Sequence, residues 1–188
     1  MSQYSPRVTA ALSVVDEDAY TLDPDGSPVT QTTSTRLIAS TLDSLDVRPG
    51  MSVLEIGTGS GFSGVLLSEL VGSTGAVVSV DVVPGLVERA RDLHTRFGRT
   101  NVTLFARDGH EGVPEQGPYD RVVAWTTPET IPHTWVEQSR SGALMIALVE
   151  LGGLVKTHAV MAAEVTDEQG LTGLALSREG TSRCMARA

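Results

Sequence analysis

The chain has 188 residues, a length that fits one domain with a buried core. Hydrophobic residues make up 40% and charged residues 20%, a globular profile that excludes intrinsic disorder and disulfide-rich scaffolds. The net charge is −9, which disfavours nucleic acid and anionic membrane surfaces as partners because binding to both depends on clustered Lys and Arg.

The N-terminal stretch, residues 2–35, is polar and contains Asp-Pro-Asp-Gly at 23–26. It predicts a loop-rich arm with at most one short helix around residues 8–15. It lacks the basic and apolar regions of a signal peptide, and no apolar run of the chain approaches the ~20 residues of a membrane span. The single cysteine, Cys184, suits a reducing compartment, so we expect a cytoplasmic protein.

From residue 34 onward, blocks typical of helices alternate with blocks typical of strands. Helices are expected at 34–45, 61–70, 84–97 and 131–138, and strands at 52–56, 76–80, 102–106, 119–125 and 143–149. This alternation predicts a doubly wound, Rossmann-like α/β fold with a mostly parallel sheet covered on both faces. Near the end of the chain, residues 154–165 and 171–177 flank a turn and predict a C-terminal β-hairpin.

A glycine-rich turn, Val-Leu-Glu-Ile-Gly-Thr-Gly-Ser-Gly at 53–61, follows the first predicted strand. Glycine has no Cβ and tolerates positive φ, so a ligand can touch the backbone there, and the next helix offers unpaired N–H groups. Asp81 closes the second strand 20 residues after Gly61, where an acidic side chain accepts hydrogen bonds from ribose hydroxyls. Together these features predict an adenosine-containing ligand, although the glycines alone could serve a tight turn and Asp81 alone could cap a helix.

Two cofactors are compatible with this turn. The spacing Gly59-x-Gly61-x-x-Gly64 matches the dinucleotide fingerprint and favours NAD. Glu55, at the penultimate position of the strand, would repel a pyrophosphate but suit the positive charges of S-adenosyl-L-methionine, which we therefore favour. Asp108, followed by Gly109, comes after the third strand, where it could accept a hydrogen bond from an adenine amino group or form an Asp-Gly turn.

The histidines do not indicate a metal site. His94, His110, His133 and His158 are scattered without the i, i+3 or i, i+4 spacing of ligands on one helix face, so we expect no metal. Trp125 closes the fourth strand beside the expected crevice, where it could contact a substrate or pack as a wall.

Four segments together are more specific than the glycine turn alone. They are LEIGTGSGFSGVLLSELVG at 54–72, SVD at 79–81, RDGHEGVPEQGPYDRVVAW at 107–125 and IPHTWVEQ at 131–138. In this order they resemble the protein-L-isoaspartate O-methyltransferases, a family with the class I S-adenosylmethionine-dependent methyltransferase fold. The resemblance covers residues 29–149 and implies methyl transfer from S-adenosyl-L-methionine to an aspartyl-derived carboxyl of a protein or peptide. We divide the single domain into an arm on the substrate side, residues 1–33, and a methyltransferase region, residues 34–188.

The resemblance also implies roles for individual residues. Those expected to bind the cofactor are Glu55, Ile56, Gly57, Thr58, Gly59, Gly61, Asp81, Val82, Asp108 and Gly109. The family's serine beside the substrate carboxyl falls on Thr33, with Ser34 and Thr32 as neighbouring candidates, although these hydroxyls could instead cap the following helix. Arg36 and Trp125 are candidates for substrate binding, and Arg36 also fits a solvated helix face.

Both ends of the chain depart from the family pattern, so three alternatives to an isoaspartyl-specific enzyme stay open. The stretch DGSPVTQTTST at 25–35 resembles a branch that methylates an ordinary aspartate of a ribosomally made peptide and so drives aspartimide formation. The other two are an NAD-binding oxidoreductase and a non-catalytic module that binds S-adenosyl-L-methionine. Oligomeric state cannot be predicted from these patterns.

Overall fold

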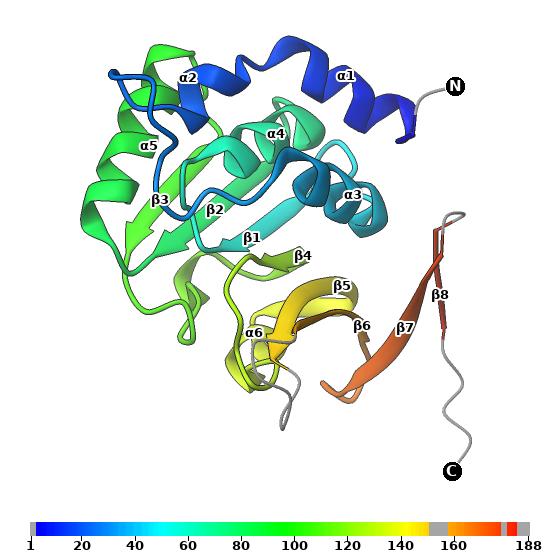
Figure 1. Cartoon of the computed structure of the whole chain (residues 1–188). Helices are drawn as coiled ribbons and strands as arrows, with labels where there is room; N and C mark the ends of the chain where they lie inside the picture. The colour runs from blue at the N-terminus through cyan, green and yellow to red at the C-terminus, as the bar shows by residue number, and fades with distance from the viewer. Residues whose placement is uncertain (1–2, 151–157, 178–179, 184–188) are drawn as a thin grey trace.

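The computed structural model describes residues 3–150, 158–177 and 180–183. The strands within them are β1 (Ser52–Ile56), β2 (Ala76–Asp81), β3 (Val102–Ala106), β4 (Tyr119–Ala124), β5 (Ser139–Glu150), β6 (His158–Val165), β7 (Leu171–Ser177) and β8 (Gly180–Arg183). They form one sheet in the order β3-β2-β1-β4-β5-β6-β7-β8 (Figure 1). Strands β1 to β5 run parallel to one another, whereas β6 pairs antiparallel with β5, and β7 and β8 continue the antiparallel part.

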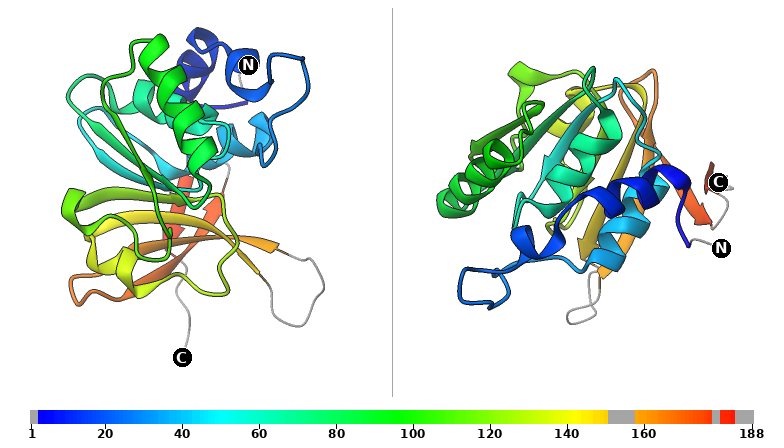
Figure 2. Two further views of the ribbon diagram at one scale, coloured as in Figure 1. Left: turned by 90° about the vertical axis from the view of Figure 1, so that its left-hand side faces the viewer. Right: turned by 90° about the horizontal axis from the view of Figure 1, so that it is seen from above.

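Helices cover the parallel part of this sheet. They are α1 (Pro6–Val14), α2 (Glu17–Thr21), α3 (Thr35–Leu45), α4 (Phe62–Val71), α5 (Pro84–Arg96), α6 (His133–Glu137) and the short 3₁₀ helix η1 (Pro114–Gln116). The helices α1 to α5 lie over one face, as the view from above in Figure 2 shows, while η1 and α6 belong to segments that cover the other. None of the described helices has the length and hydropathy that a membrane span requires.

Side chains alternate between two apolar clusters on the two faces of the sheet. In β1, Val53 packs among residues of α4, whereas Leu54 and Ile56 pack with Tyr119 and Trp135 on the opposite side. A parallel strand with both faces buried has a nearly continuous run of apolar residues in its sequence, which explains why these strands can be predicted from the sequence. The predicted α/β alternation and the C-terminal hairpin of β6 and β7 are confirmed.

The sheet order reverses at β1, which pairs with β2 on one side and β4 on the other. Ligands of open α/β sheets bind at such a reversal, beside the carboxyl ends of the strands. The register places Glu55 of β1 opposite Ser79 of β2 and Val123 of β4, so these three positions share one level of the sheet. One level further, β1, β2 and β4 end at a common edge.

The short helix expected around residues 8–15 is confirmed by α1, but the limit of one helix was wrong, because the arm also contains α2. The Ser5 hydroxyl accepts a hydrogen bond from the Val8 N–H at the start of α1, and Asp16 caps α2 in the same way. Val8 and Tyr20 are buried in the cluster around α4. Short helices gain most of their stability from such tertiary packing, which a polar composition does not reveal.

Smaller differences concern the second half of the chain. The helix predicted at 131–138 is shorter in the structure, and the strand predicted at 143–149 begins earlier, at residue 139. Strand β8 was not predicted. Residues 154–157 of the predicted hairpin and Cys184 lie outside the described residues.

Candidate active site

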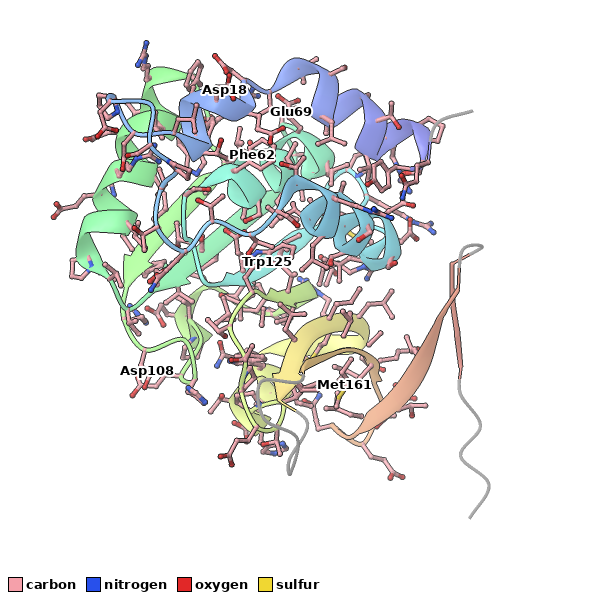
Figure 3. All side chains as sticks on the ribbon, viewed as in Figure 1. Asp18, Phe62, Glu69, Asp108, Trp125 and Met161 are labelled. Atoms are coloured by element: carbon pink, nitrogen blue, oxygen red, sulfur yellow. The ribbon has the colours of Figure 1, made fainter. Side chains whose placement is uncertain are left out.

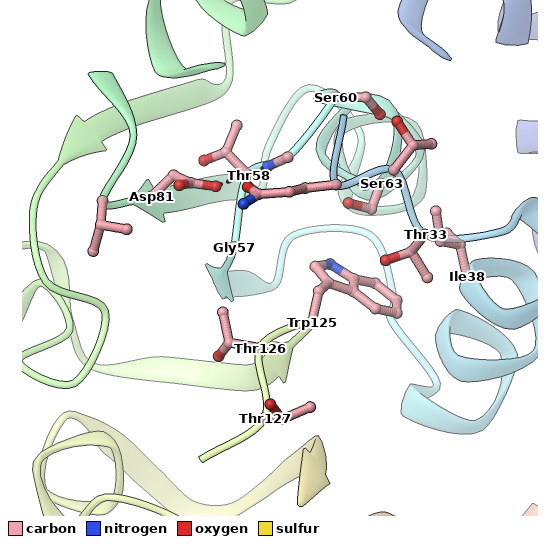
Figure 4. Close-up of a pocket in the computed structure, with 14 residues that line it drawn as sticks. Thr33, Ile38, Gly57, Thr58, Ser60, Ser63, Asp81, Trp125, Thr126 and Thr127 are labelled. Carbon is pink, nitrogen blue, oxygen red and sulfur yellow. Dashed lines mark hydrogen bonds between the residues drawn. The ribbon is translucent and has the colours of Figure 1, made fainter. Parts of the chain in front are cut away.

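A cavity of about 510 Å³ opens at the common edge of β1, β2 and β4 (Figure 4). It is lined by Gln31, Thr32, Thr33, Ile38, Gly57, Thr58, Gly59, Ser60, Ser63, Asp81, Val82, Trp125, Thr126 and Thr127. These residues come from the arm and the start of α3, from the turn between β1 and α4 and the first turn of α4, and from the ends of β2 and β4. The cavity therefore lies between the arm and the point at β1 where the strand order reverses.

The glycine turn forms the floor of the cavity. Gly57, Gly59 and Gly61 have φ angles of +94°, +51° and +84°, a region that favours glycine because other residues pay a steric cost there. A Cβ on Gly59 would lie 3.1 Å from the carbonyl oxygen of Gln31, so the arm passes directly over the turn. Gly61 precedes α4 and packs against Ala90 outside the cavity.

Asp81 lies in the cavity with both carboxyl oxygens held by backbone. Its Oδ2 accepts a hydrogen bond from the Gly59 N–H and its Oδ1 accepts one from the Val83 N–H, each at 3.0 Å. A carboxylate oxygen has a further lone pair, so each can still accept a bond from a ligand hydroxyl. Val82, beside it, has 66% of its surface exposed and offers an apolar flank for a planar ring.

Glu55 lies beneath the cavity, fully buried, and does not form part of its wall. Its carboxylate accepts hydrogen bonds from Ser63 Oγ, from Ser79 Oγ and from the indole Nε1 of Trp125. Burial raises the pKa of Glu55, and these three donors act against that rise. Direct contact between Glu55 and a ligand's positive charge, as predicted, does not fit this burial, whereas the carboxylate does fix Trp125 and Ser63, which line the cavity.

The hydroxyl-rich segment before α3 places Thr32 and Thr33 in the cavity wall. The Thr32 hydroxyl donates to the Val29 carbonyl at 2.7 Å. Within the described part of the chain, the Thr33 hydroxyl has no hydrogen-bond partner, and Figure 4 shows the side chains of Thr33 and Trp125 among those that line the cavity. Ser34 is the exposed N-cap residue of α3 and lies outside the cavity, and its side chain makes no capping bond.

The remaining predicted residues of β1 and its turn support the wall. The Ile56 carbonyl accepts a hydrogen bond from the Trp125 N–H at 2.9 Å, and its side chain is buried. Thr58 lines the cavity, and its hydroxyl pairs with Ser79 Oγ at 2.7 Å. Arg36 is exposed on α3 and does not reach the cavity.

The predicted pair after β3 does not line the cavity either. Asp108 has 60% of its side chain exposed and accepts a hydrogen bond from the His110 N–H. Figure 3 shows it well apart from Trp125. A Cβ on Gly109 would lie 2.6 Å from the Ile56 side chain, so glycine is needed there for packing. This arrangement fits the Asp-Gly turn that the sequence left open.

Several cavity residues were not predicted: Gln31, Ile38, Ser60, Ser63, Thr126 and Thr127. Thr126 and Thr127 directly follow Trp125 at the end of β4, and that position next to a predicted parallel strand was a usable signal. Gln31 and Ile38 carry no such signal, because only the packing of the arm and of α3 against the sheet brings them to its edge.

The histidines lie elsewhere. His94 is buried in α5, whereas His110 and His133 are exposed beside Asp108 and Glu137. Among the residues that the structure describes, no group of three or more His, Cys, Asp or Glu side chains could hold a metal ion. The side chain of His158 lies outside that description.

Comparison with known proteins identifies the family. Residues 5–169 match the family model described as protein-L-isoaspartate(D-aspartate) O-methyltransferase (PCMT). The chain belongs to this family. That membership confirms the family predicted from the four sequence segments and does not favour the oxidoreductase or the non-catalytic module.

Curated relatives named protein-L-isoaspartate O-methyltransferase are similar to large parts of this chain. The one from Methanocella arvoryzae is 37% identical over 143 residues, which cover 75% of this chain and 76% of the relative. The one from Ignicoccus hospitalis is 36% identical over 114 residues, or 61% of this chain and 54% of the relative. The chain therefore spans about half the length of some curated relatives that it matches.

Solved PCMT structures share the fold. One protein-L-isoaspartate O-methyltransferase superimposes with a TM-score of 0.82 at 25% identity, covering 98% of this chain and 62% of that one. A Plasmodium falciparum structure, described as a beta-aspartate methyltransferase (PCMT) in complex with S-adenosyl-L-homocysteine, has a TM-score of 0.73 at 15% identity, covering 95% and 87%. The Rossmann-like class I methyltransferase fold is thus confirmed.

Proposed function

We propose that this protein transfers a methyl group from S-adenosyl-L-methionine to the carboxyl of an isoaspartyl or aspartyl residue in a protein or peptide. The observation that supports this most directly is the unpaired hydroxyl of Thr33, which shares one cavity with the glycine turn and Asp81. Membership of the PCMT family supports the same reaction.

The cavity suits the cofactor in size and in chemistry. Its volume of about 510 Å³ lies within the usual range of roughly 300–1,000 Å³ for small-molecule sites. Asp81 would hold the ribose hydroxyls, Val82 would flank the adenine, and the backbone at Gly57 and Gly59 would meet the methionine part. When bound, S-adenosyl-L-methionine supplies an electrophilic methyl group on a sulfonium. The complex of the Plasmodium relative with S-adenosyl-L-homocysteine supports this assignment.

The chain's own residues act by positioning. A side-chain carboxyl with an ordinary pKa of about 4 is ionised at neutral pH, so no general base is needed. The Thr33 hydroxyl donates to one carboxylate oxygen and leaves the other free to attack, while Trp125 and Ile38 wall the site with apolar surface. Correct orientation of two reactants is worth up to ~7–11 kcal/mol, enough to make positioning the main contribution.

The arm is part of the proposed active site. Thr32 and Thr33 lie at the junction between residues 1–33 and residues 34–188, which we propose as the substrate-side arm and the methyltransferase region of a single domain. Burial of Tyr20 in the same cluster as α4 supports folding of both parts together. A cytoplasmic location stays a prediction from the single cysteine.

The proposal is tested with two synthetic peptides that differ only in an isoaspartyl or an aspartyl linkage. Each is incubated with the protein and S-adenosyl-L-methionine, and a gain of one methyl group is measured by mass spectrometry. We expect methylation of the isoaspartyl peptide. Methylation of the aspartyl peptide supports the carboxyl transfer with a substrate like that of the peptide-maturation branch, and methylation of neither contradicts the proposal.

Variants of the hydroxyl segment test the role of Thr33. Removing the hydroxyl in Thr33→Ala should lower kcat/KM about 10- to 100-fold, the equivalent of roughly 1.4–2.7 kcal/mol, whereas Thr33→Ser should stay close to the parent. Ser34→Ala is the matched control, because Ser34 is adjacent but lies outside the cavity. An equal loss in the control would contradict the assignment of Thr33.

A further inference from the structure

Arg89 of α5 links the arm to the glycine turn. Its Nη1 donates to the carbonyl oxygens of Tyr20 at 2.9 Å and Ser60 at 3.1 Å, and its Nη2 donates to that of Leu22 at 2.9 Å. Its Nε lies 3.6 Å from Asp23 Oδ1. All three guanidinium nitrogens therefore face the arm or the turn, and only 23% of the side chain is exposed.

The hydrogen bonds continue from this guanidinium to the substrate side of the cavity. Thr21 lies between Tyr20 and Leu22, whose carbonyl oxygens Arg89 binds. The Thr21 carbonyl accepts a hydrogen bond from the Val29 N–H at 2.8 Å. The Val29 carbonyl in turn accepts the bond from the Thr32 hydroxyl, and Thr33 is the next residue. The position of the Thr33 hydroxyl thus depends on a chain of contacts that begins at Arg89.

Two further contacts show what Arg89 adds to the attachment of the arm. At the cavity, the Gln31 carbonyl lies directly over Gly59, so a small shift of the arm would move it against the turn. Behind the cavity, Tyr20 is 1% exposed, and its ring stacks on Phe97 with centroids 5.7 Å apart. The arm is therefore anchored by apolar burial even without Arg89, whose bonds set its exact placement.

We propose that Arg89 is a positioning residue that holds the arm in the register at which Thr33 meets the substrate carboxyl. Its catalytic consequence rests on the proposed methyltransferase function. The planar guanidinium carries several N–H donors in a fixed arrangement, so it can bind two carbonyls of the arm and one of the glycine turn at the same time. A Lys ammonium is a point charge on a flexible stem and can bind only some of these three carbonyls. Arg89→Lys should therefore rescue only part of what Arg89→Met loses.

The matched control is Arg91→Met, on the same helix. Arg91 also donates to one backbone carbonyl, that of Leu104 at 3.0 Å, but that carbonyl belongs to β3 and not to the arm. The control removes the same charge and the same side-chain type from α5. It separates the link to the arm from any general effect on the helix or on net charge.

The experiment combines amide hydrogen exchange with steady-state kinetics and calorimetric titration with S-adenosyl-L-homocysteine. In Arg89→Met we expect exchange in residues 20–33 to be at least ten-fold faster and exchange in β1 and β4 to be unchanged. We expect kcat for the peptide to fall ten-fold or more, while KM for S-adenosyl-L-methionine and Kd for S-adenosyl-L-homocysteine stay within three-fold. Arg89→Lys should be intermediate, and Arg91→Met should match the parent.

Unchanged exchange in residues 20–33 of both Arg89 variants would overturn the proposal, and so would the same loss of kcat in Arg91→Met. A loss of protection spread evenly over the whole sheet would also overturn it, since that indicates general stability and not placement of the arm. If the parent protein methylates no peptide, the proposed function is wrong. The exchange measurements would still test whether Arg89 positions the arm.

Discussion

Acidification should destabilise this protein through one buried imidazole. His94 in α5 is 2% exposed, its Nδ1 lies 3.3 Å from the Tyr20 hydroxyl, and its Nε2 has no partner among the described residues. Burial lowers the pKa of His94 from its usual 6.5 to about 4, and the positive charge of Arg99 acts in the same direction. The folded protein therefore favours the neutral ring.

The sign and size of the effect follow from proton linkage. The unfolded chain takes up a proton on His94 near pH 6.5, whereas the folded chain resists it until about pH 4. The stability that depends on the neutral ring is thus complete above pH 6.5 and is lost as the pH falls toward 4. At about 1.4 kcal/mol for each pH unit, the full loss is roughly 3 kcal/mol.

The assay is urea unfolding of the parent and of His94→Gln at several values between pH 8 and pH 4.5. Subtracting the two free-energy profiles cancels the other titrating groups, and the difference should change by 2–3 kcal/mol, about the size calculated above. His110→Gln, at a side chain that is 68% exposed, is the control and should follow the parent. A His94→Gln profile parallel to that of the parent would refute the reasoning.

Three further predictions concern the glycine turn, the buried acid and the arm. Gly61→Ala should lower the free energy of unfolding by about 1–3 kcal/mol in urea titrations, because the backbone at Gly61 has a φ of +84° and an added Cβ would lie 3.0 Å from the Ala90 side chain. Gly85→Ala is the control and should not lower it, because an added Cβ there would meet open space. Glu55→Gln should lower the free energy of unfolding by about 2 kcal/mol and weaken the binding of S-adenosyl-L-homocysteine in calorimetry, because the amide nitrogen of Gln would face a group that now donates to the carboxylate. Unchanged binding would contradict the inference that Glu55 holds Trp125 in the cavity wall. Burial raises the pKa of Tyr20 to about 12, so stability should fall as the pH rises from 10 toward 12, and Tyr20→Phe should lose this extra fall in melting experiments at pH 9 and 11.

Local chemistry explains which parts of the site the sequence predicts. Gly57 and Gly59 of the turn and Asp81 at the end of β2 line the cavity as expected, whereas Gly61 lies outside it, because strand periodicity locates the sheet edge but not which turn residues face the cavity. The burial of a side chain, in contrast, depends on residues that are distant in the sequence. Glu55 was placed correctly at the end of β1, but only its three donors, from α4, β2 and the end of β4, decide that it lies below the cavity.

The arm shows the opposite case. Its polar composition predicted loops and at most one short helix, yet Val8, Ala11 and Tyr20 are buried in the cluster that includes residues of α4, and α2 also contacts α5. Asp108 was expected in the cavity because it follows a parallel strand, but β3 lies at the end of the sheet order, away from the reversal at β1. Position next to a strand end is therefore a weaker indicator than position next to the reversal.

The sequence by itself determined the family, the alternation of strands and helices from β1 to β5 and the glycine turn, because each depends on neighbouring residues or on short periodic patterns. Only the tertiary structure decided how residues 20–33 reach the turn at 57–61. Arg89 reaches carbonyls of the arm that are almost 70 residues away in the chain, and no local pattern specifies such a contact. Its cause is the packing of two short helices onto the sheet, which places backbone carbonyls within reach of one guanidinium.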